Sequence, residues 1–573
     1  MKKFLSLFIS LVLITTLLAG CGPKQGTSQT EEDTPKSNTT ETTEAKEKTP
    51  EKEQTTQTPT TETTTAEQKI IFALHDVPDG IDPNVTNNSF ATPFLSNCFE
   101  GLVSINEKNE LAPALAEKWT ISEDGKTYTF TLRDNLKWSD GSPLTSADFM
   151  YTMERILKPE TTCQNVTMLT DYVVNALACY EGKVPFDQVG FKAPDEKTFV
   201  IELMDPASFY IDILSLFIYC PVQKATVEAN GDKWTLSADT YVVNGPFKIT
   251  KMNMNEAIVL TKNEHYWDAA NVTLEEITFR MIKDQATALL AFDSKEIDGM
   301  RSVPMADFAR LKAESNDLHI VPSYATSYYL LNNAQPPYDN VLVRKALNLA
   351  VDRNSLIENV LQGNAIPAYS LFAPGYIFNG KDFTEGRSNY GLSANANVEE
   401  AKKALAEAGY PNGEGFPTMK LSYYTSPQVK LIAEALAQMF KENLNINVEI
   451  TNSEWAVYYA EVQAGKYEVA AMGVGADYLH PMSFAPVFIS TEPTNDTGYG
   501  SKFYDEKIIA AKKELDPEKM LNLIREAEDI LMEDYPFLPL YHRSSSLLMR
   551  DYVQGWTLSP TGNFCFKYAK VVK

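Results

Sequence analysis

The chain has 573 residues, and its 51 Lys and Arg face 76 Asp and Glu, which gives a formal net charge of −25. That length is too great for one compact core and predicts about three or four folded units. The acidic balance argues against nucleic acid as a partner, because a phosphate backbone attracts clustered Lys and Arg. The five His do not pair at metal-ligand spacing, so we expect no metal site and no cofactor.

The N-terminus predicts export from the cytoplasm. Lys2 and Lys3 precede an apolar stretch at 4–18, which is shorter than the roughly 20 residues that cross a membrane. The stretch ends in Leu18-Ala19-Gly20-Cys21, which resembles a bacterial lipobox, where the chain is cut before the cysteine and the cysteine carries lipid. We therefore predict a signal peptide at 1–20 and lipid attachment at Cys21, with an ordinary secretory signal as the alternative.

The next segment is predicted to be a disordered tether, comprising the lipidated cysteine and residues up to 68. Residues 22–67 contain no aromatic and no branched aliphatic side chain, so they cannot bury enough apolar area to fold. A flexible coil of that length spans roughly 40 Å. The segment either spaces the folded body from the membrane or is a tolerated tail.

The cysteines predict thiols rather than a disulfide framework. Without Cys21 five remain, an odd number, and no C-x-x-C pair occurs. We expect buried free thiols, and one disulfide remains open as an alternative.

The folded body begins at Lys69 with a short apolar run at 70–74 that is typical of a buried strand. Residues 127–132 alternate between large apolar side chains and Thr, which predicts a half-buried antiparallel strand. Thr145 and Asp148 have the spacing of a capping box and predict the start of a helix.

The C-terminal half alternates strand and helix patterns. We predict strands at 419–424, 446–450 and 467–472 and helices at 428–442 and 454–463. This order implies a parallel sheet with helices on its faces. Ligands of such sheets bind beyond the carboxyl ends of the strands.

The turn after the last of these strands carries an acidic residue. Gly473 and Gly475 lead to Asp477, which would point into a cleft, although a plain turn or cap role is the alternative. Tyr478 stands where a third glycine would complete a dinucleotide-binding turn. No phosphate loop, nucleophile elbow or H-E-x-x-H occurs either, so nothing in the sequence favours an enzyme.

Several ordered blocks resemble one known family. They are FEGLV at 99–103, LAPALAEKW at 111–119, FTLR at 130–133, KWSDGSPLT at 137–145, NGPF at 244–247, HYW at 265–267, VRKALNLAVDR at 343–353 and the helix end at 401–410. Together they resemble the peptide/nickel-type extracellular solute-binding proteins of ABC importers, from about residue 70 to the C-terminus. Tyr369, Trp455 and the Ala476-Asp477-Tyr478 element are most similar to the oligopeptide-binding branch.

The resemblance implies an α/β, two-lobed periplasmic-binding-protein-like fold of type II, with an additional inserted domain and a central ligand cleft. We expect lobe I at 69–325 plus 541–573, an insertion at about 87–212, and lobe II at 326–540. Closure of such lobes about a hinge encloses the ligand.

The resemblance also assigns substrate-binding roles. Asp477 would hold the α-ammonium group of a peptide, Trp455 would line a side-chain pocket, Tyr151 would lie near the bound peptide, and Gly475 would belong to the same site. Two positions depart from the family, because Ala471 and Val474 stand where relatives carry Arg and Trp. Peptide length and side-chain preference are therefore left open.

The implied function is capture of extracellular oligopeptides by a monomeric lipoprotein that delivers them to the permease and ATPase subunits of an ABC importer. Its location would be the outer face of a Gram-positive cell membrane, with lipid as the anchor. The alternatives are a binder of dipeptides, a metal chelate or an oligosaccharide, and a peptide-pheromone receptor without a transport partner.

Overall fold

The computed structural model describes residues 66–572 except 87 and 379. The predicted signal peptide, the lipid-attachment residue Cys21 and nearly all of the predicted tether lie outside the described residues. Among the helices of the described part, none is long and apolar enough to cross a membrane.

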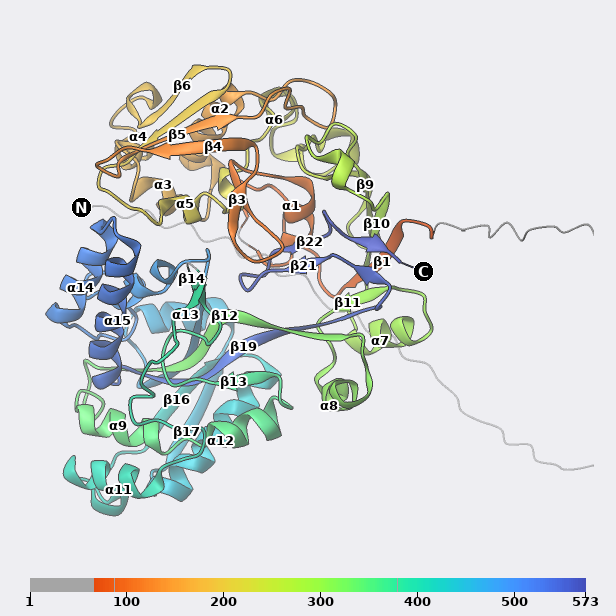
Figure 1. The fold of residues 1–573 in the computed structure, drawn as a ribbon. Helices are drawn as coiled ribbons and strands as arrows, with labels where there is room; N and C mark the ends of the chain where they lie inside the picture. Colours follow the sequence, from red (N-terminus) through yellow and green to blue (C-terminus); the bar gives the residue numbers. More distant parts are fainter. Residues whose placement is uncertain (1–65, 87, 379, 573) are drawn as a thin grey trace, which may run out of the picture. The chain divides into compact units, whose positions relative to one another are not determined.

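One large mixed sheet runs through the folded body (Figure 1). Its order is β17 (Val448–Ser453), β16 (Met419–Tyr424), β18 (Val469–Gly475), β12 (Leu318–Leu331), β19 (Phe537–Met549), β11 (Gly299–Arg301), β1 (Lys69–Leu74), β10 (Glu276–Met281), β9 (Ala257–Lys262) and β8 (Phe247–Asn253), with β13 (Ala365–Pro367) paired to β19. A separate sheet has the order β4 (Ala116–Ile121), β5 (Thr127–Leu132), β7 (Thr198–Glu202) and β6 (Phe191–Asp195). Short ribbons pair β2 (Val103–Ile105) with β3 (Leu111–Pro113), β14 (Ile377–Phe378) with β15 (Lys381–Asp382), β20 (Val553–Gln554) with β23 (Lys570–Val571), and β21 (Thr557–Leu558) with β22 (Phe564–Cys565).

Helices surround these sheets. In the first half they are α1 (Thr92–Cys98), α2 (Ser146–Ile156), α3 (Thr167–Thr170), α4 (Ala176–Tyr180), α5 (Tyr210–Ile213), α6 (Lys224–Asn230), α7 (Gln285–Asp293) and α8 (Met305–Glu314). In the second half they are α9 (Val341–Leu349), α10 (Arg353–Ser355), α11 (Val398–Glu407), α12 (Pro427–Leu444), α13 (Trp455–Gln463), α14 (Lys502–Lys513) and α15 (Pro517–Glu533).

The predicted N-terminal elements are confirmed. Strand β1 is buried and lies parallel to β10 and β11. Strand β5 coincides with the predicted strand, pairs antiparallel with β4 and β7, and buries every second side chain. The capping box at the start of α2 is complete, because the Thr145 side chain accepts from the helix backbone while Asp148 accepts from the Thr145 backbone N–H at 2.8 Å.

The predicted parallel sheet of the second half is also confirmed. Strand β16 lies parallel to β17 on one side and to β18 on the other. The boundaries differ, since β17 begins two residues later than predicted and β18 continues to Gly475. Strand β18 is longer because β12 pairs with it through Gly473 and Gly475, which sequence preference alone does not favour in a strand.

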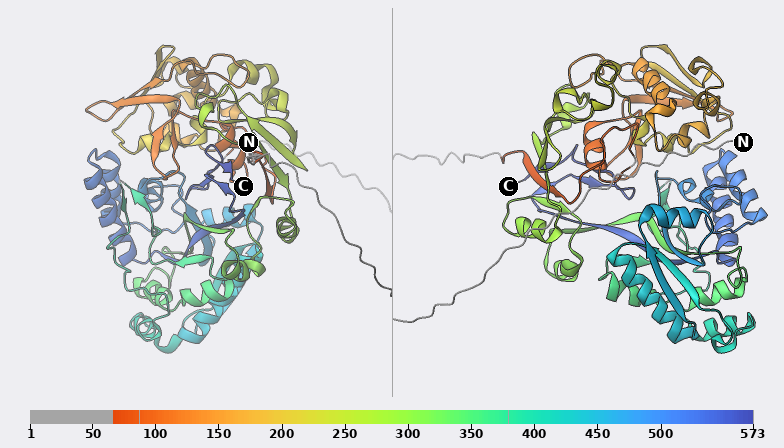
Figure 2. Two further views of the ribbon diagram at one scale, coloured as in Figure 1. Left: turned by 45° about the vertical axis from the view of Figure 1, so that its right-hand side comes forward. Right: turned by 180° about the vertical axis from the view of Figure 1, so that it is seen from behind.

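Two long antiparallel strands connect the two ends of the large sheet. Strand β12 pairs with β18 and β19, and β19 pairs in turn with β11, so the strands link the β16–β18 group to the β1–β10 group. Figures 1 and 2 show β12 in green and β19 in blue running side by side. The predicted ranges of the lobes and the insertion stay predictions, and the separate four-stranded sheet falls within the predicted insertion.

The remaining cysteines are free thiols, as expected. Cys98, Cys163 and Cys220 are buried, whereas Cys179 and Cys565 are partly exposed. Burial in an apolar environment disfavours the thiolate and raises the pKa of the Cys163 thiol to about 11.

Candidate functional site

Strand β18 has an unpaired edge next to the predicted site. Its first residues pair with β16, but that pairing ends at Ser422 and Ala470. Its pairing with β12 continues on the other side as far as Gly475. From Ala471 onward, one side of β18 therefore lacks a strand partner within the described residues.

The direction of the hydrogen bonds identifies which residues face this open edge. The Ala471 carbonyl accepts a hydrogen bond of 2.6 Å from the Tyr458 hydroxyl, on the side away from β12. The Ala476 N–H donates in the opposite direction, to the Tyr324 carbonyl of β12 at 2.7 Å. Because backbone groups alternate along an extended strand, those of Gly473 and Gly475 point to the same open side as Ala471.

Packing requires glycine at position 473 but not at position 475. A methyl group on Gly475 would meet the Ala325 Cβ at 3.7 Å, an ordinary contact, so packing does not require glycine there. A methyl group on Gly473 would overlap the guanidinium of Arg543 and lie 2.9 Å from the Thr326 carbonyl oxygen. A bare backbone at both positions allows another chain to approach closely.

Asp477 lies just beyond this edge and is exposed. Its backbone N–H donates to Ser483 Oγ at 2.8 Å, which fixes the turn that carries the side chain. No described residue donates to its carboxylate or forms an ion pair with it. Surrounding protein nevertheless desolvates the carboxylate and raises its pKa above the ordinary value. Exposure together with desolvation is what a recess open to solvent produces.

That recess is a cavity of about 120 Å³ that collects distant parts of the chain. Its polar lining consists of Asp477 and the neutral side chains Thr86, Asn88, Thr92, Asn165, Thr561 and Asn563. These residues come from the predicted lobe I, insertion and lobe II. None of the described residues that line it is Lys or Arg, so the carboxylate is the charged group of the cavity.

Trp455 lies at the start of α13 with 51% of its surface exposed. Its ring stacks on Tyr459 with a centroid distance of 5.3 Å and meets Tyr424 edge-on at 5.3 Å. Tyr424 ends β16, the strand whose departure opens the edge of β18, and Tyr458 of α13 bonds to Ala471. Trp455 is therefore the exposed member of an aromatic cluster beside the start of the open edge.

Tyr151 lies on α2, apart from the cavity around Asp477. Its half-buried ring has the Lys224 ammonium 5.7 Å from its centre, and burial raises the pKa of its hydroxyl. It is not among the residues that line the Asp477 cavity. The structure therefore has Gly475 and Asp477 at one end of the open edge, Trp455 beside its other end near Ala471, and Tyr151 apart from both.

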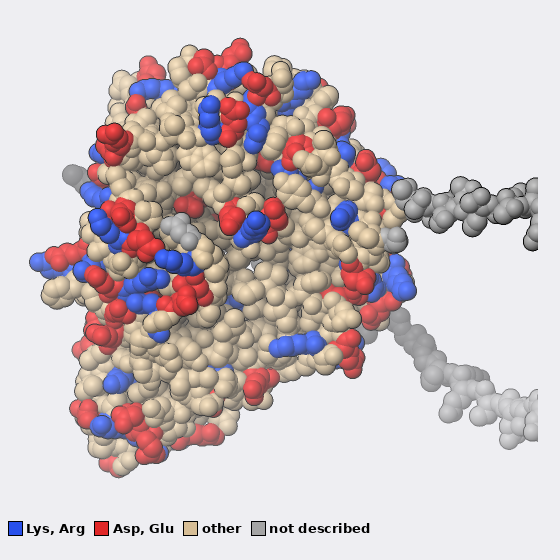
Figure 3. All heavy atoms as spheres, viewed as in Figure 1, with Lys and Arg blue, Asp and Glu red and all other residues tan. Residues whose placement is uncertain are grey.

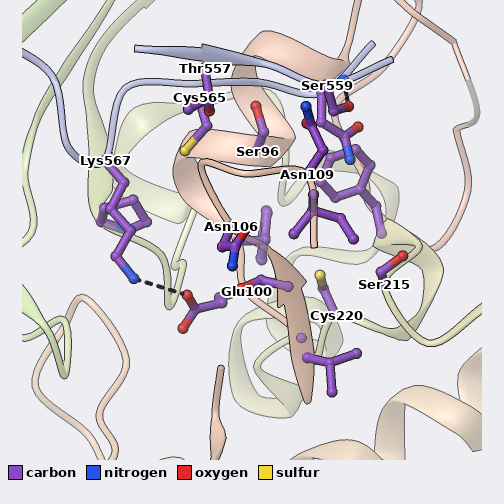
Figure 4. A pocket seen from close by; sticks show the side chains of 18 residues that line it. Ser96, Glu100, Asn106, Asn109, Ser215, Cys220, Thr557, Ser559, Cys565 and Lys567 are labelled. Carbon is purple, nitrogen blue, oxygen red and sulfur yellow. Dashed lines mark hydrogen bonds and ion pairs between the residues drawn. The ribbon is translucent and has the colours of Figure 1, made fainter. Parts of the chain in front are cut away.

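A second cavity, seen in Figure 4, is a poorer candidate because its charges are already neutralised. Glu100 accepts hydrogen bonds from Tyr266 at 2.7 Å and from the Trp267 indole at 2.5 Å. The Lys567 ammonium lies 3.6 Å from Glu100 and 3.2 Å from Asp268. This network ties the C-terminal segment to Glu100, just beyond α1, and each of its charged side chains already has a partner within the protein.

Arg543 of β19 was not predicted as a site residue. It reaches Gly473 across β12, which separates β19 from β18 in the sheet. The strands involved are far apart in the sequence, so no local motif indicates the contact. The only local signal is the G-x-G spacing itself.

Within the described residues, no group of three or more His, Cys, Asp or Glu is arranged to hold a metal ion.

Comparison with known proteins gives a consistent family. Residues 110–496 match the model described as bacterial extracellular solute-binding proteins, family 5 middle. The dipeptide-binding protein DppE of Bacillus subtilis is 32% identical over 88% of this chain and 92% of its own length. The oligopeptide-binding protein OppA of the same organism is 33% identical over 86% of this chain and 90% of its own length.

Solved structures agree with the sequence match. The crystal structure of Haemophilus influenzae OppA in complex with RPPGFSPFR has a TM-score of 0.72 and 30% identity, covering 89% of this chain and 99% of the other. The predicted α/β fold of type II with an extra domain is thereby confirmed. Such a family consists of binding proteins rather than enzymes. The chain belongs to the bacterial extracellular solute-binding proteins of family 5.

Proposed function

We propose that this protein is the peptide-binding component of an ABC importer and that it captures peptides in an extended conformation. The observation that carries the proposal is the Asp477 carboxylate, which is accessible, has no cationic partner among the described residues, and lies at the end of the open edge of β18. Named relatives that bind dipeptides and oligopeptides support the same class of ligand.

The site matches the two features that all peptides share. A peptide backbone completes a strand ladder with the groups of Gly473 and Gly475, whatever its side chains are. Its α-ammonium group supplies the cation that Asp477 lacks. Trp455 offers a broad aromatic wall to the side chains, and water fills pockets that a given side chain leaves empty.

Membership of the family supports the rest of the proposed cycle. The protein delivers its peptide to a membrane permease that an ATPase drives, and it acts outside the cytoplasm. We propose that lipid on Cys21 anchors it to the outer face of a Gram-positive membrane, with the low-complexity segment as its tether. Labelling cells with a radioactive fatty acid tests this anchor. We expect the label to be attached to the wild-type protein and to be absent from Cys21→Ser.

The test of recognition compares Asp477→Asn with the wild type by calorimetry. The variant keeps the shape of the side chain but not its charge. We expect it to fold and to bind free-amine peptides about 2–5 kcal/mol more weakly, since the peptide ammonium is left buried without a partner. The wild type should likewise bind N-acetylated peptides weakly. Asp293→Asn, at an exposed position on α7, is the matched control and should bind normally.

Equal affinity of the wild type for free and N-acetylated peptides would contradict the proposed role of Asp477. Absence of binding to any peptide, free or acetylated, would contradict the proposed ligand class.

A further inference from the structure

We infer that Arg543 binds the α-carboxylate of the peptide and that its distance from Asp477 selects peptides of about four residues. This inference rests on the proposed function and specifies the ligand of the same site. Arg543 has no anionic partner among the described residues, and it lies against the same strand that leads to Asp477.

Arg543 is exposed, and it contacts the neutral residues Ser327 and Gly473. Its Nε donates to Ser327 Oγ at 2.8 Å, which orients the guanidinium and leaves its terminal nitrogens for other acceptors. Across the described part of the chain, no Asp or Glu forms an ion pair with it. An exposed arginine without a counter-charge is suited to bidentate binding of a carboxylate.

The guanidinium of Arg543 lies against β18. The terminal nitrogen lies against Gly473, so the charge reaches β18 at a residue whose backbone faces the open edge. Tyr541 lies nearby: burial raises the pKa of its hydroxyl, while a hydrogen bond to Ser327 and the positive charge of Arg543 act in the opposite direction. The cation and the open edge therefore belong to one surface.

The distance between Arg543 and Asp477 determines the length of the peptide that can contact both. Gly473 and Asp477 are four residues apart, and an extended chain rises about 3.3 Å per residue, so the two positions are at most about 13 Å apart, because β18 ends at Gly475 and Asp477 begins the turn. An extended peptide of four residues has its terminal charges at about that separation. With its ammonium at Asp477 and its carboxylate at Gly473, the peptide runs antiparallel to β18. The reach of the two side chains extends the preferred length to about three to five residues.

The experiment uses alanine-based peptides of two to eight residues, each with a free carboxylate and as the C-terminal amide, all with a free amine. We expect the wild type to bind lengths of three to five most tightly and amidation to weaken those peptides at least tenfold. In Arg543→Gln the amidation penalty and the length preference should both disappear. Arg310→Gln, which removes an exposed arginine of α8, is the control and should keep both.

A positioning variant gives a second measurement. Ser327→Ala removes the hydrogen bond that orients Arg543 and should reduce the amidation penalty while leaving the penalty for N-acetylation unchanged. If Arg543→Gln fails to fold, Ser327→Ala still tests the role of Arg543: an unchanged amidation penalty, or no amidation penalty in the wild type, would overturn it.

The two proposals fail in different ways. Loss of affinity on N-acetylation without any effect of amidation would overturn the role of Arg543 and leave that of Asp477 intact. Dependence on an acidic side chain in place of the terminal carboxylate would also overturn it. Peptide binding that depends on neither terminus would overturn the proposed role of Asp477 as well, and absence of binding to any peptide would overturn the proposed function.

Discussion

The Asp477 side chain combines two properties that seldom occur together in a structural residue. A carboxylate on an ordinary surface is exposed and well hydrated, and a structural carboxylate inside a protein is paired. Asp477 is exposed but desolvated, and it has no cationic partner among the described residues. The free energy lost by this desolvation is recovered only when a cation enters the recess, so the residue is better suited to binding than to stability.

The raised pKa of Asp477 predicts a pH dependence of binding. The ammonium partner requires the ionised carboxylate, so affinity is full above the raised pKa and is lost as the pH falls through it. For an ordinary Asp this loss would occur near pH 3.9. We expect calorimetric affinity for a free-amine peptide to decline at a higher pH than that, before far-UV circular dichroism shows unfolding.

The alkaline side has a different cause. The peptide α-amino group has a pKa of about 8, so affinity should fall again as it deprotonates. A peptide whose N-terminus is trimethylated keeps its charge and serves as the control, since only its acid limb should remain. On the acid side, an affinity that stays constant down to pH 4 while the protein remains folded would contradict the proposed role of Asp477.

At the scale of elements, the important feature is the divergence of β16 from β18. The two strands pair at Leu421 and Ser422 and then separate, while β12 continues to support β18. The Tyr458 hydroxyl caps the Ala471 carbonyl where the separation begins. A supported strand with one free edge binds an extended chain without changing its own conformation, which keeps the cost of ordering low.

The free edge predicts a specific pattern of amide protection. Amide hydrogen exchange in residues 472–476 of the protein should slow when a tetrapeptide binds, because the backbone amides of Gly473 and Gly475 gain hydrogen-bond acceptors. Segments in β1 and β5 serve as internal references and should not change. A tetrapeptide N-methylated at its central amides should bind more weakly and protect this segment less. Unchanged exchange at saturating peptide would exclude strand addition.

The sequence predicts these elements well where periodicity and packing agree. The alternation in β5 and the apolar spacing in α12 correspond to faces that the structure buries. The predicted strand ends at Met472 because glycines disfavour a strand, whereas β18 continues to Gly475 because it pairs with β12, which is a tertiary effect. The function-bearing part of that strand is therefore the part that local preference misses.

At the scale of the whole molecule, the candidate site depends on contacts that no sequence motif contains. Asp477 could be predicted from its turn and from the family resemblance, because both are local in sequence. Arg543 lies 66 positions later, on β19, and reaches Gly473 only because β12 and β19 run side by side. The neutral lining of the Asp477 cavity likewise comes from segments between Thr86 and Asn563. The pairing of strands that are distant in the sequence, rather than the residue types in any one motif, brings the residues of the site together.

Net charge acts over the same scale and predicts how peptides reach the site. With −25 for the chain, the protein attracts cations at long range, and acidic and basic side chains are interspersed on the face shown in Figure 3. The Debye length shortens from about 30 Å at 0.01 M salt to about 3 Å at 1 M. We expect the association rate of a tetrapeptide with two Lys to fall several-fold between 0.02 and 0.5 M salt, measured by stopped-flow fluorescence.

The dissociation rate should change much less, because the Asp477 contact is formed inside the recess, where mobile ions screen it weakly. An isosteric peptide with two Gln in place of the Lys separates steering from general salt effects, since its association rate should depend only slightly on salt. If both peptides respond equally, or if salt acts mainly on dissociation, long-range attraction does not guide capture. The affinity would then depend on the recess alone, and the acidic surface would serve solubility rather than recognition.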